Sequence, residues 1–201
     1  MAQTARSRLL AIVRRRRIVG ARDAARAGIH SQQITRLVAE GILERVARGQ
    51  YRLAERPVSE HHALAIAARS IPRGVICLLS ALGVHGLGTQ LPAEVWIAID
   101  RRARVPRVRE LPLQVVKFSG TSFTEGIETR RIEGEPVRVY GVAKTLADLF
   151  KHRKRVGIEV AIEALRDAWR AKKVTIDALD RAAAVCRVEH VMRPYVEAVV
   201  A

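Results

Sequence analysis

Four glycines interrupt residues 1–53 at intervals too short for a long helix or a broad sheet: Gly20, Gly28, Gly41 and Gly49. Glycine ends helices and permits tight turns because it lacks a Cβ atom. The segments before Gly41 carry apolar residues at helical spacing, and the segment after it alternates as strands do. This part of the chain is therefore expected to fold as three short helices followed by a small hairpin.

The second and third of these helices predict a helix-turn-helix. A first helix is expected over residues 4–16, and residues 21–28 form a short second helix that Gly28 closes. Ser31, a good N-cap residue, is expected to begin the third helix. The core-facing positions of this helix follow the i, i+3, i+4 spacing: Ile34, Leu37 and Val38. Two short helices joined by a tight glycine-containing turn match the motif.

A basic hairpin follows the third helix directly. Residues 43–46 and 50–53 are predicted as two strands around Ala47–Gly49, and a hairpin in this position is a wing. The polar, proline-containing segment 54–59 is predicted as a linker. The expected domains are therefore residues 1–55, a winged helix-turn-helix, and residues 60–201.

The remaining chain mixes strand and helix patterns. Apolar alternation predicts strands within 93–100 and 111–120, and residues 128–141 are expected to form a hairpin that turns at Glu133–Glu135. Residues 142–201 are expected to form three or four helices. The fold class is therefore α+β, an N-terminal winged helix-turn-helix followed by a mixed α/β C-terminal domain.

Charge indicates the kind of partner. The net charge is +16, which favours a polyanion such as nucleic acid. Residues 1–53 contain twelve arginines against three carboxylates, those of Asp23, Glu40 and Glu44. The positive charge is therefore concentrated where the helix-turn-helix is expected.

The third helix of a winged helix enters the major groove of DNA, and its solvent face contacts bases and phosphates. Glutamine can pair with adenine, arginine can fork onto guanine, and free N–H groups at a helix start suit a phosphate. The alternatives are an ordinary solvated helix face and a hairpin that only completes the small core. The predicted DNA-binding residues on helix and wing are Ser31, Gln32, Gln33, Thr35, Arg36, Arg45, Arg48, Gln50 and Arg52.

Two further basic runs have a structural explanation as well as a functional one. The run Arg14–Arg17 lies at the C-terminal end of the first expected helix, where positive charge complements the helix dipole. These arginines are therefore interpreted either as a solvated helix end or as phosphate-binding residues. A second basic surface, for phosphates or for an acidic protein partner, is an alternative to a plain solvated loop at Arg101, Arg102, Arg104, Arg107 and Arg109.

The sequence lacks the motifs that would indicate other classes of function. We find no zinc-protease spacing, phosphate loop or nucleophile elbow, so neither an enzyme, a metal site nor a cofactor is expected. Thr145 and Asp148 are interpreted as residues that stabilise a helix start. Cys77 and Cys186 are expected to be buried thiols. Charges interrupt every apolar run, so no membrane span is expected and the protein is predicted to be cytoplasmic.

Three segments, in this order, resemble the AbiEi family, the antitoxins of type IV toxin-antitoxin systems and their stand-alone relatives. They are ITRLVAEGILERVARGQYRL (34–53), LLSALGVHGLGTQLPAEVWIAI (78–99) and VRVYGVAKTLADLF (137–150). The resemblance implies a cytoplasmic repressor that binds inverted repeats in its own promoter through double-stranded DNA contacts. It also implies that the C-terminal domain counters a nucleotidyltransferase-like toxin without a stable complex. The family's DNA-reading positions fall on Gln32, Gln33, Thr35, Arg36 and the wing arginines.

The sequence leaves two other hypotheses. One is a stand-alone winged-helix transcription factor whose second domain senses a ligand or a protein partner. The other, a nuclease or nucleotide-transferring enzyme tethered to DNA, requires an acidic metal site that the strands do not provide. For antitoxicity, the resemblance directs attention to the loop 101–109 and to the helix that begins at Lys144.

Overall fold

A computed structural model describes residues 4–57 and 59–200 and divides the chain into two compact units. Unit 1 comprises Met1–Pro72, Arg107–Pro112 and Arg131–Val137, and unit 2 comprises Arg73–Pro106, Leu113–Arg130 and Arg138–Ala201. These units do not divide at the predicted linker 54–59, because the helix after the linker and two later segments pack within unit 1.

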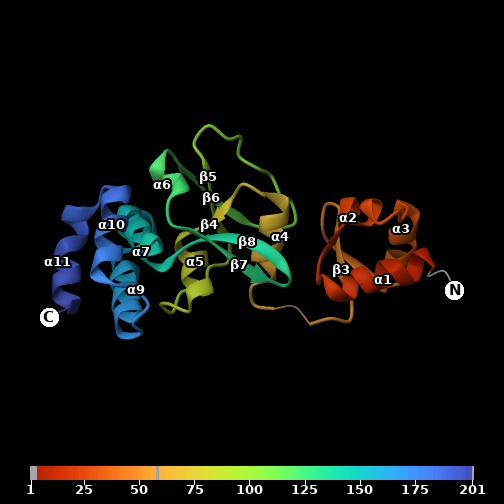
Figure 1. The fold of residues 1–201 in the computed structure, drawn as a ribbon, viewed down its shortest axis with the longest axis horizontal. Coiled ribbons are helices and arrows are strands. Elements are labelled where there is room, and N and C mark those ends of the chain that lie inside the picture. Colours follow the sequence, from red (N-terminus) through yellow and green to blue (C-terminus); the bar gives the residue numbers. More distant parts are fainter. Residues whose placement is uncertain (1–3, 58, 201) are drawn as a thin grey trace. The chain divides into compact units, whose positions relative to one another are not determined.

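The first part of unit 1 is a three-helix domain with a small sheet (Figure 1). Its elements are α1 (Ala5–Arg15), β1 (Val19–Gly20), α2 (Ala21–Arg26), α3 (Ser31–Ala39), β2 (Leu43–Ala47) and β3 (Gln50–Leu53). The sheet has the order β1-β3-β2 with antiparallel pairings. The predicted helices and hairpin are confirmed, and β1 is an addition, since two residues are too few to show strand periodicity.

The helices of this domain bury the apolar faces that their spacing predicts. Leu9 and Val13 of α1, Ile34 and Leu37 of α3, and Leu43 of β2 belong to one core cluster and are at most 4% exposed. Each such side chain contributes about 1.5–3 kcal/mol by leaving water. This core fixes the rotation of α3 about its own axis, and therefore which of its residues face solvent.

Helix α4 (His62–Ser70) also belongs to unit 1 and ends before Pro72. The side chain of Arg69 contacts Asp23 of α2, and Ser70 accepts a hydrogen bond from Gln50 of β3. These contacts explain why α4 groups with the winged helix although it follows the linker.

A second sheet has five strands in the order β6-β5-β4-β8-β7. The strands are β4 (Val75–Ile76), β5 (Val95–Asp100), β6 (Leu113–Phe118), β7 (Ile127–Ile132) and β8 (Glu135–Tyr140). Strand β4 pairs antiparallel with β5 and parallel with β8, while β5 and β6 are parallel. The hairpin predicted over 128–141 is confirmed as β7 and β8, and the two-residue strand β4 was not predicted.

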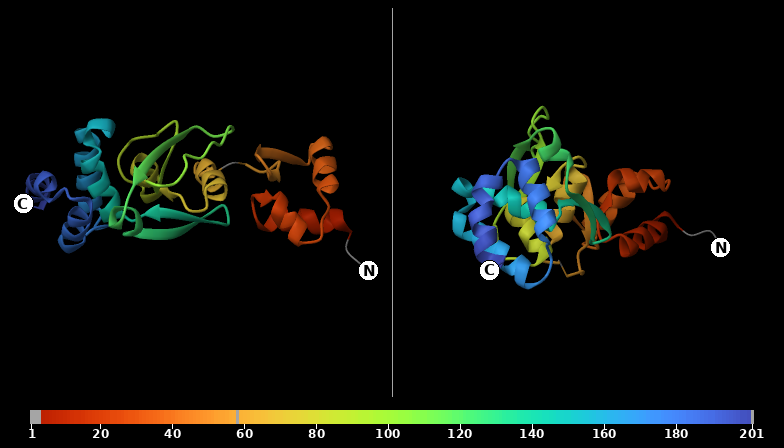
Figure 2. Two further views of the ribbon diagram at one scale, coloured as in Figure 1. Left: turned by 90° about the horizontal axis from the view of Figure 1, so that it is seen from above. Right: turned by 60° about the vertical axis from the view of Figure 1, so that its left-hand side comes forward.

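Helices complete unit 2. They are α5 (Leu78–His85), α6 (Thr121–Thr124), α7 (Val142–Lys151), α8 (Arg153–Val156), α9 (Ile158–Arg170), α10 (Ile176–Cys186) and α11 (Glu189–Val200). Helix α7 is buried along almost its whole length and packs against α5, α9 and α10, in agreement with the views in Figures 1 and 2. Cys77 and Cys186 are buried and free, which confirms their predicted state.

Candidate nucleic-acid interface

Helix α3 presents one polar face to solvent. Ile34 and Leu37 turn into the core, and Ser31, Gln32, Thr35 and Arg36 are exposed, while Gln33 is half-buried. The N-cap residue is His30, whose Nδ1 accepts a hydrogen bond from the backbone N–H of Gln32 at 3.4 Å. This corrects the prediction that Ser31 caps the helix: Ser31 is the first helical residue, and its side chain is free for solvent.

Arg36, the basic residue of this face, forms an ion pair with Glu40. The Nε atom of Arg36 donates to Oε1 of Glu40 at 3.1 Å, and Nη1 of Arg6 lies 2.7 Å from Oε2 of the same carboxylate. The Arg36 side chain is nevertheless 71% exposed. Its guanidinium therefore remains accessible at the Nη atoms.

Two wing arginines keep the predicted exposure. Arg45 on β2 and Arg48 in the β2–β3 turn are exposed, and Gly49 adopts φ +70° in that turn. The β2–β3 register shifts between Arg45 and Ala47, where Nε of Arg45 donates to the Ala47 carbonyl. The irregular register turns this edge of the hairpin locally.

The other two wing residues do not face solvent as predicted. Gln50 is 6% exposed, and its Nε2 donates to Oγ of Ser70 at 2.8 Å. The Arg52 side chain is 14% exposed and is paired with Glu44 and the carbonyl of Arg56. Both side chains fasten the wing to α4 and the linker, so we remove them from the candidate interface.

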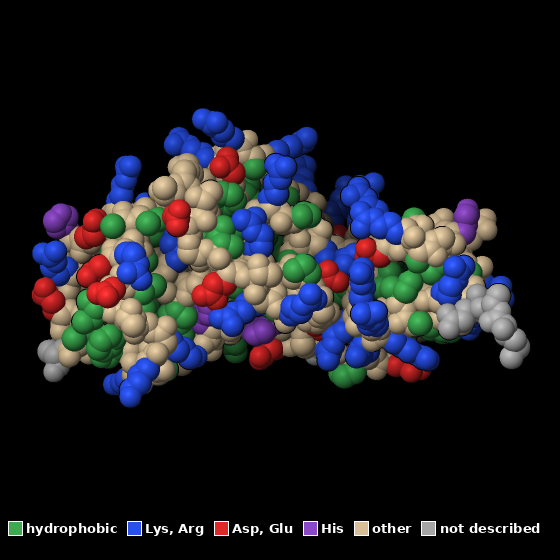
Figure 3. Space-filling model, in the orientation of Figure 1, with side chains coloured by type: hydrophobic (Ala, Val, Ile, Leu, Met, Phe, Trp, Pro, Cys, Tyr) green, Lys and Arg blue, Asp and Glu red, His purple; other side chains and the backbone are tan. Residues whose placement is uncertain are grey.

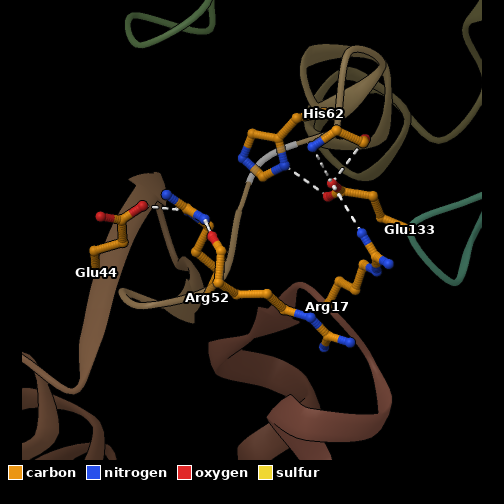
Figure 4. A network of polar contacts seen from close by, with 7 residues as sticks. Arg17, Glu44, Arg52, His62 and Glu133 are labelled. Carbon is orange, nitrogen blue, oxygen red and sulfur yellow. Dashed lines mark hydrogen bonds and ion pairs between the residues drawn. The ribbon is translucent and has the colours of Figure 1, made fainter.

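Arg52 borders a polar network in unit 1 that centres on Glu133 (Figure 4). The Glu133 side chain is 4% exposed, and Oε1 accepts from the N–H and the Oγ of Ser59 at 3.2 and 2.8 Å. Nδ1 of His62 lies 2.6 Å from Oε2, and Nη1 of Arg17 lies 3.9 Å from Oε1. Burial raises the pKa of Glu133, but the hydrogen bonds from His62 and Ser59 outweigh it and hold the pKa below the usual 4.5.

Replacing Glu133 with Gln should therefore destabilise unit 1 in a pH-dependent way. Because the pKa of Glu133 is lower in the folded state, its stabilising contribution is complete above about pH 4.5 and is lost as the pH falls through the folded-state pKa. We expect a loss of roughly 1.5–3 kcal/mol near neutral pH, the range for hydrogen bonds to charged groups. Urea unfolding at several pH values measures it.

Glu55→Gln is the matched control, since Glu55 is exposed and makes no ion pair among the described residues. A difference between Glu133→Gln and the unsubstituted protein that stays constant from pH 7 to pH 3 would contradict the assignment of the network to the ionised carboxylate.

The arginine run at the end of α1 is split by the fold. Arg14 and Arg15 are exposed, whereas Nη1 of Arg16 lies 3.5 Å from Oδ1 of Asp23 and Arg17 faces Glu133. Half of the run therefore faces carboxylates within unit 1. For Arg14 and Arg15, a solvated helix end and a contact with a DNA phosphate both stay predictions.

Arg22 is an interface candidate that the sequence analysis missed. The backbone N–H of Ala21 donates to the carbonyl of Gly49 at 2.8 Å, so the first turn of α2 lies against the turn of the wing. Arg22 is exposed beside it. The signal was available, because the first helix of a helix-turn-helix crosses the DNA backbone.

The five arginines of the second basic segment are exposed. Arg101, Arg102 and Arg104 in unit 2, and Arg107 and Arg109 in unit 1, all have exposed side chains. Whether they bind phosphates or an acidic partner stays a prediction. Figure 3 shows lysine and arginine side chains spread over the visible face of the molecule, so exposure of basic groups alone does not distinguish this segment.

Among the described residues, no cluster of three or more histidine, cysteine, aspartate or glutamate side chains is arranged to hold a metal ion. Within the same residues, every helix is too short or too polar to cross a bilayer.

Three helices, a β1-β3-β2 sheet and a hairpin after α3 define the N-terminal domain as a winged helix-turn-helix. Residues 7–54 match the family model described as "Transcriptional regulator, AbiEi antitoxin". The resemblance to AbiEi proteins is thus confirmed over these residues.

A solved structure extends the likeness of fold to the rest of the chain. The RV2827C protein from Mycobacterium tuberculosis matches with a TM-score of 0.63 and 14% sequence identity, covering 100% of this chain and 82% of that one. At this identity the likeness concerns the fold alone. No curated protein sequence matches the chain significantly.

Proposed function

We propose that this protein is a cytoplasmic, DNA-binding transcriptional repressor of its own operon and the antitoxin of a type IV toxin-antitoxin system. One observation carries the proposal: α3 exposes four polar side chains while its apolar face is locked in the core. They are Ser31, Gln32, Thr35 and Arg36. The family match over residues 7–54 supports the regulator and antitoxin assignments.

In this proposal α3 lies in the major groove. Gln32 reads adenine, Arg36 forks onto guanine, and the methyl group of Thr35 contacts thymine. Ser31 binds a phosphate through its hydroxyl and its backbone N–H, and half-buried Gln33 borders the contact. Arg45 and Arg48 of the wing and Arg22 of α2 bind the DNA backbone, which sets the position of α3 without selecting bases.

The DNA target is an inverted repeat in the promoter. A monomeric winged helix reads one half-site, so two copies bind a repeat symmetrically.

The C-terminal part of the chain counters a nucleotidyltransferase-like toxin that the adjacent gene encodes, without a stable complex. Growth of cells that co-express the adjacent gene, with and without this protein, tests the antitoxin half separately from DNA binding.

Arginine substitutions on helix and wing should weaken DNA binding in two different ways. Arg36→Ala should cost about 1–3 kcal/mol on the promoter and relax the base preference at one position, because it removes a base contact. Arg48→Ala should weaken binding to all sequences alike and reduce the slope of log K against log salt concentration by about 0.9. Titration of the promoter fragment and a scrambled fragment at two salt concentrations measures both effects.

Arg170→Ala is the matched control, since Arg170 is exposed on α9 in unit 2. An Arg36→Ala protein that binds promoter and scrambled DNA in the same ratio as the unsubstituted protein would remove α3 as the reading helix. A footprint of the protein on its own upstream region tests the autorepressor assignment directly.

A further inference from the structure

Glu40 stands where local helix physics does not favour it. It is the C-cap residue of α3 and the only carboxylate between Ser31 and Glu40. A carboxylate at this end faces the negative pole of the helix dipole. The pair with Arg36 also runs from arginine to glutamate at i, i+4, and acid-before-base is the more stabilising order. Stability of α3 alone therefore gives no reason for a glutamate here.

The carboxylate of Glu40 contacts Arg36, the side chain proposed to read a base, and Arg6 of α1. Oε1 accepts from the Nε atom of Arg36, and Oε2 is held by Nη1 of Arg6 from α1. Two arginines thus fix both carboxylate oxygens, and the Glu40 side chain is only 30% exposed. Because the bond to Arg36 uses Nε, the two Nη groups at the end of the guanidinium stay free to donate to another acceptor pair.

The same contact has opposite consequences for two kinds of DNA. A guanine offers O6 and N7 to a forked donor, and an arginine already held in one orientation loses less freedom when it binds them. Non-specific binding depends on mobile cations that reach phosphates, and a carboxylate bound to Arg36 reduces the positive charge that Arg36 offers to the phosphates. Exposed ion pairs of this kind contribute little to folding, so stability does not oppose this arrangement.

We propose that Glu40 is a specificity-determining residue of the DNA interface: it orients Arg36 for end-on contact with a base and suppresses phosphate binding by Arg36, while Arg6 holds the carboxylate in place. This inference rests on the proposed function of α3. Glu40 acts through Arg36 and is a positioning residue, so it needs no contact with DNA itself. Specificity arises here in part from a repulsive group, as selective interfaces commonly arrange.

Glu40→Gln tests the inference, with Glu55→Gln as the matched control. Both substitutions remove one negative charge from unit 1, but Glu55 makes no ion pair among the described residues. Glu55→Gln should change binding to promoter and scrambled DNA by equal factors. Glu40→Gln should strengthen binding to scrambled DNA by about two- to fivefold, the range of an exposed ion pair, and leave promoter binding unchanged or weaker. The ratio of the two affinities should therefore fall.

The double variant Glu40→Gln/Arg36→Ala separates positioning from charge. If Glu40 acts through Arg36, this variant should have the same affinity ratio as Arg36→Ala alone. Two results would overturn the inference. One is a ratio of promoter to scrambled-DNA affinity that is the same for Glu40→Gln as for Glu55→Gln. The other is a ratio for the double variant that is lower than the ratio for Arg36→Ala alone. Thermal unfolding of each variant reports whether α3 is intact.

Failure of the proposed function has a different signature. In that case the unsubstituted protein binds promoter and scrambled DNA equally, before any variant is compared. A protein that prefers its promoter and shows no special effect of Glu40→Gln keeps the function and loses only the inference.

Discussion

Lys144→Met should lower the free energy of unfolding of unit 2 by about 3–5 kcal/mol, the range for removing one partner of a buried ion pair. Lys144 is 3% exposed on α7, and its Nζ lies 2.6 Å from Oδ2 of Asp148, which is 1% exposed. The ammonium also lies over the rings of Phe118 and Tyr140, at 4.8 and 4.1 Å from their centroids. Methionine fills a similar volume but leaves the Asp148 carboxylate buried without a cation.

The pH dependence of this loss identifies its cause. Burial raises the pKa of Asp148, and Lys144 opposes that rise, so removing Lys144 raises the pKa further. A carboxyl group whose pKa is higher in the folded state binds its proton more tightly there, so stability falls as the pH rises. The deficit of Lys144→Met should therefore shrink between pH 7 and pH 5, as followed by urea unfolding.

The double variant Lys144→Met/Asp148→Leu is the control for this prediction. Replacing both charges with apolar groups removes the uncompensated carboxylate, so the double variant should be less destabilised than the sum of the single variants. Cys186 donates its S–H to Oδ1 of Asp148, so some loss remains in the double variant. A Lys144→Met protein as stable as the unsubstituted one would contradict the prediction.

This pair also shows what the sequence interpretation could and could not reach. Asp148 was interpreted as a residue that stabilises the start of a helix, but it lies seven residues into α7 and is buried. The rings over which Lys144 lies, Phe118 and Tyr140, come from β6 and β8, and Cys186, which donates to Asp148, comes from α10. Helical spacing reveals the Lys144–Asp148 neighbourhood, but only tertiary packing shows that the pair is excluded from water.

The winged helix was more predictable, because its signals are local. Gly28 and Gly41 have φ values of +68° and +71°, the left-handed conformation that favours glycine at the end of a helix, and both helices end there as predicted. The apolar spacing of α3 likewise fixed its exposed face. The strands β1 and β4 escaped prediction, since two residues form a strand only when a distant partner supplies the hydrogen bonds.

The errors in the wing have a similar origin. Alternation along β3 distinguishes its two faces but does not say what covers each face. Gln50 and Arg52 are engaged by Ser70 and by the carbonyl of Arg56, which lie beyond the hairpin in the sequence. A polar residue in a wing can therefore serve the fold, and charge alone did not separate Arg52 from the exposed Arg48.

Arg69→Met should lower the free energy of unfolding of unit 1 by about 2–4 kcal/mol and weaken promoter binding. The Arg69 guanidinium lies between two carboxylates: Nη1 donates to Glu135 at 2.8 Å, and Nη2 donates to Asp23. The three side chains are 17%, 11% and 15% exposed. Methionine leaves both acids partly buried without their shared cation.

The effect should reach the DNA-binding helices through Asp23. Its Oδ2 accepts from the backbone N–H of Gly20 at 3.0 Å, which fixes the start of α2. Burial raises the pKa of Asp23, but the hydrogen bonds from Arg69 and Gly20 hold it below the usual 3.8, so the carboxylate is ionised near neutral pH. A Cβ atom on Gly20 would lie 2.5 Å from Nη2 of Arg69, so this glycine admits the guanidinium.

Urea unfolding and promoter titration of the same preparation measure both parts of this prediction. Arg73→Met is the matched control, since Arg73 is exposed four residues later and its side chain makes no ion pair among the described residues. Because Arg69 places α2 and not the α3 side chains, the variant should weaken promoter and scrambled DNA binding together, unlike Arg36→Ala. An Arg69→Met protein that unfolds and binds as Arg73→Met does would show that α4 is not needed to hold the helix-turn-helix in its binding geometry.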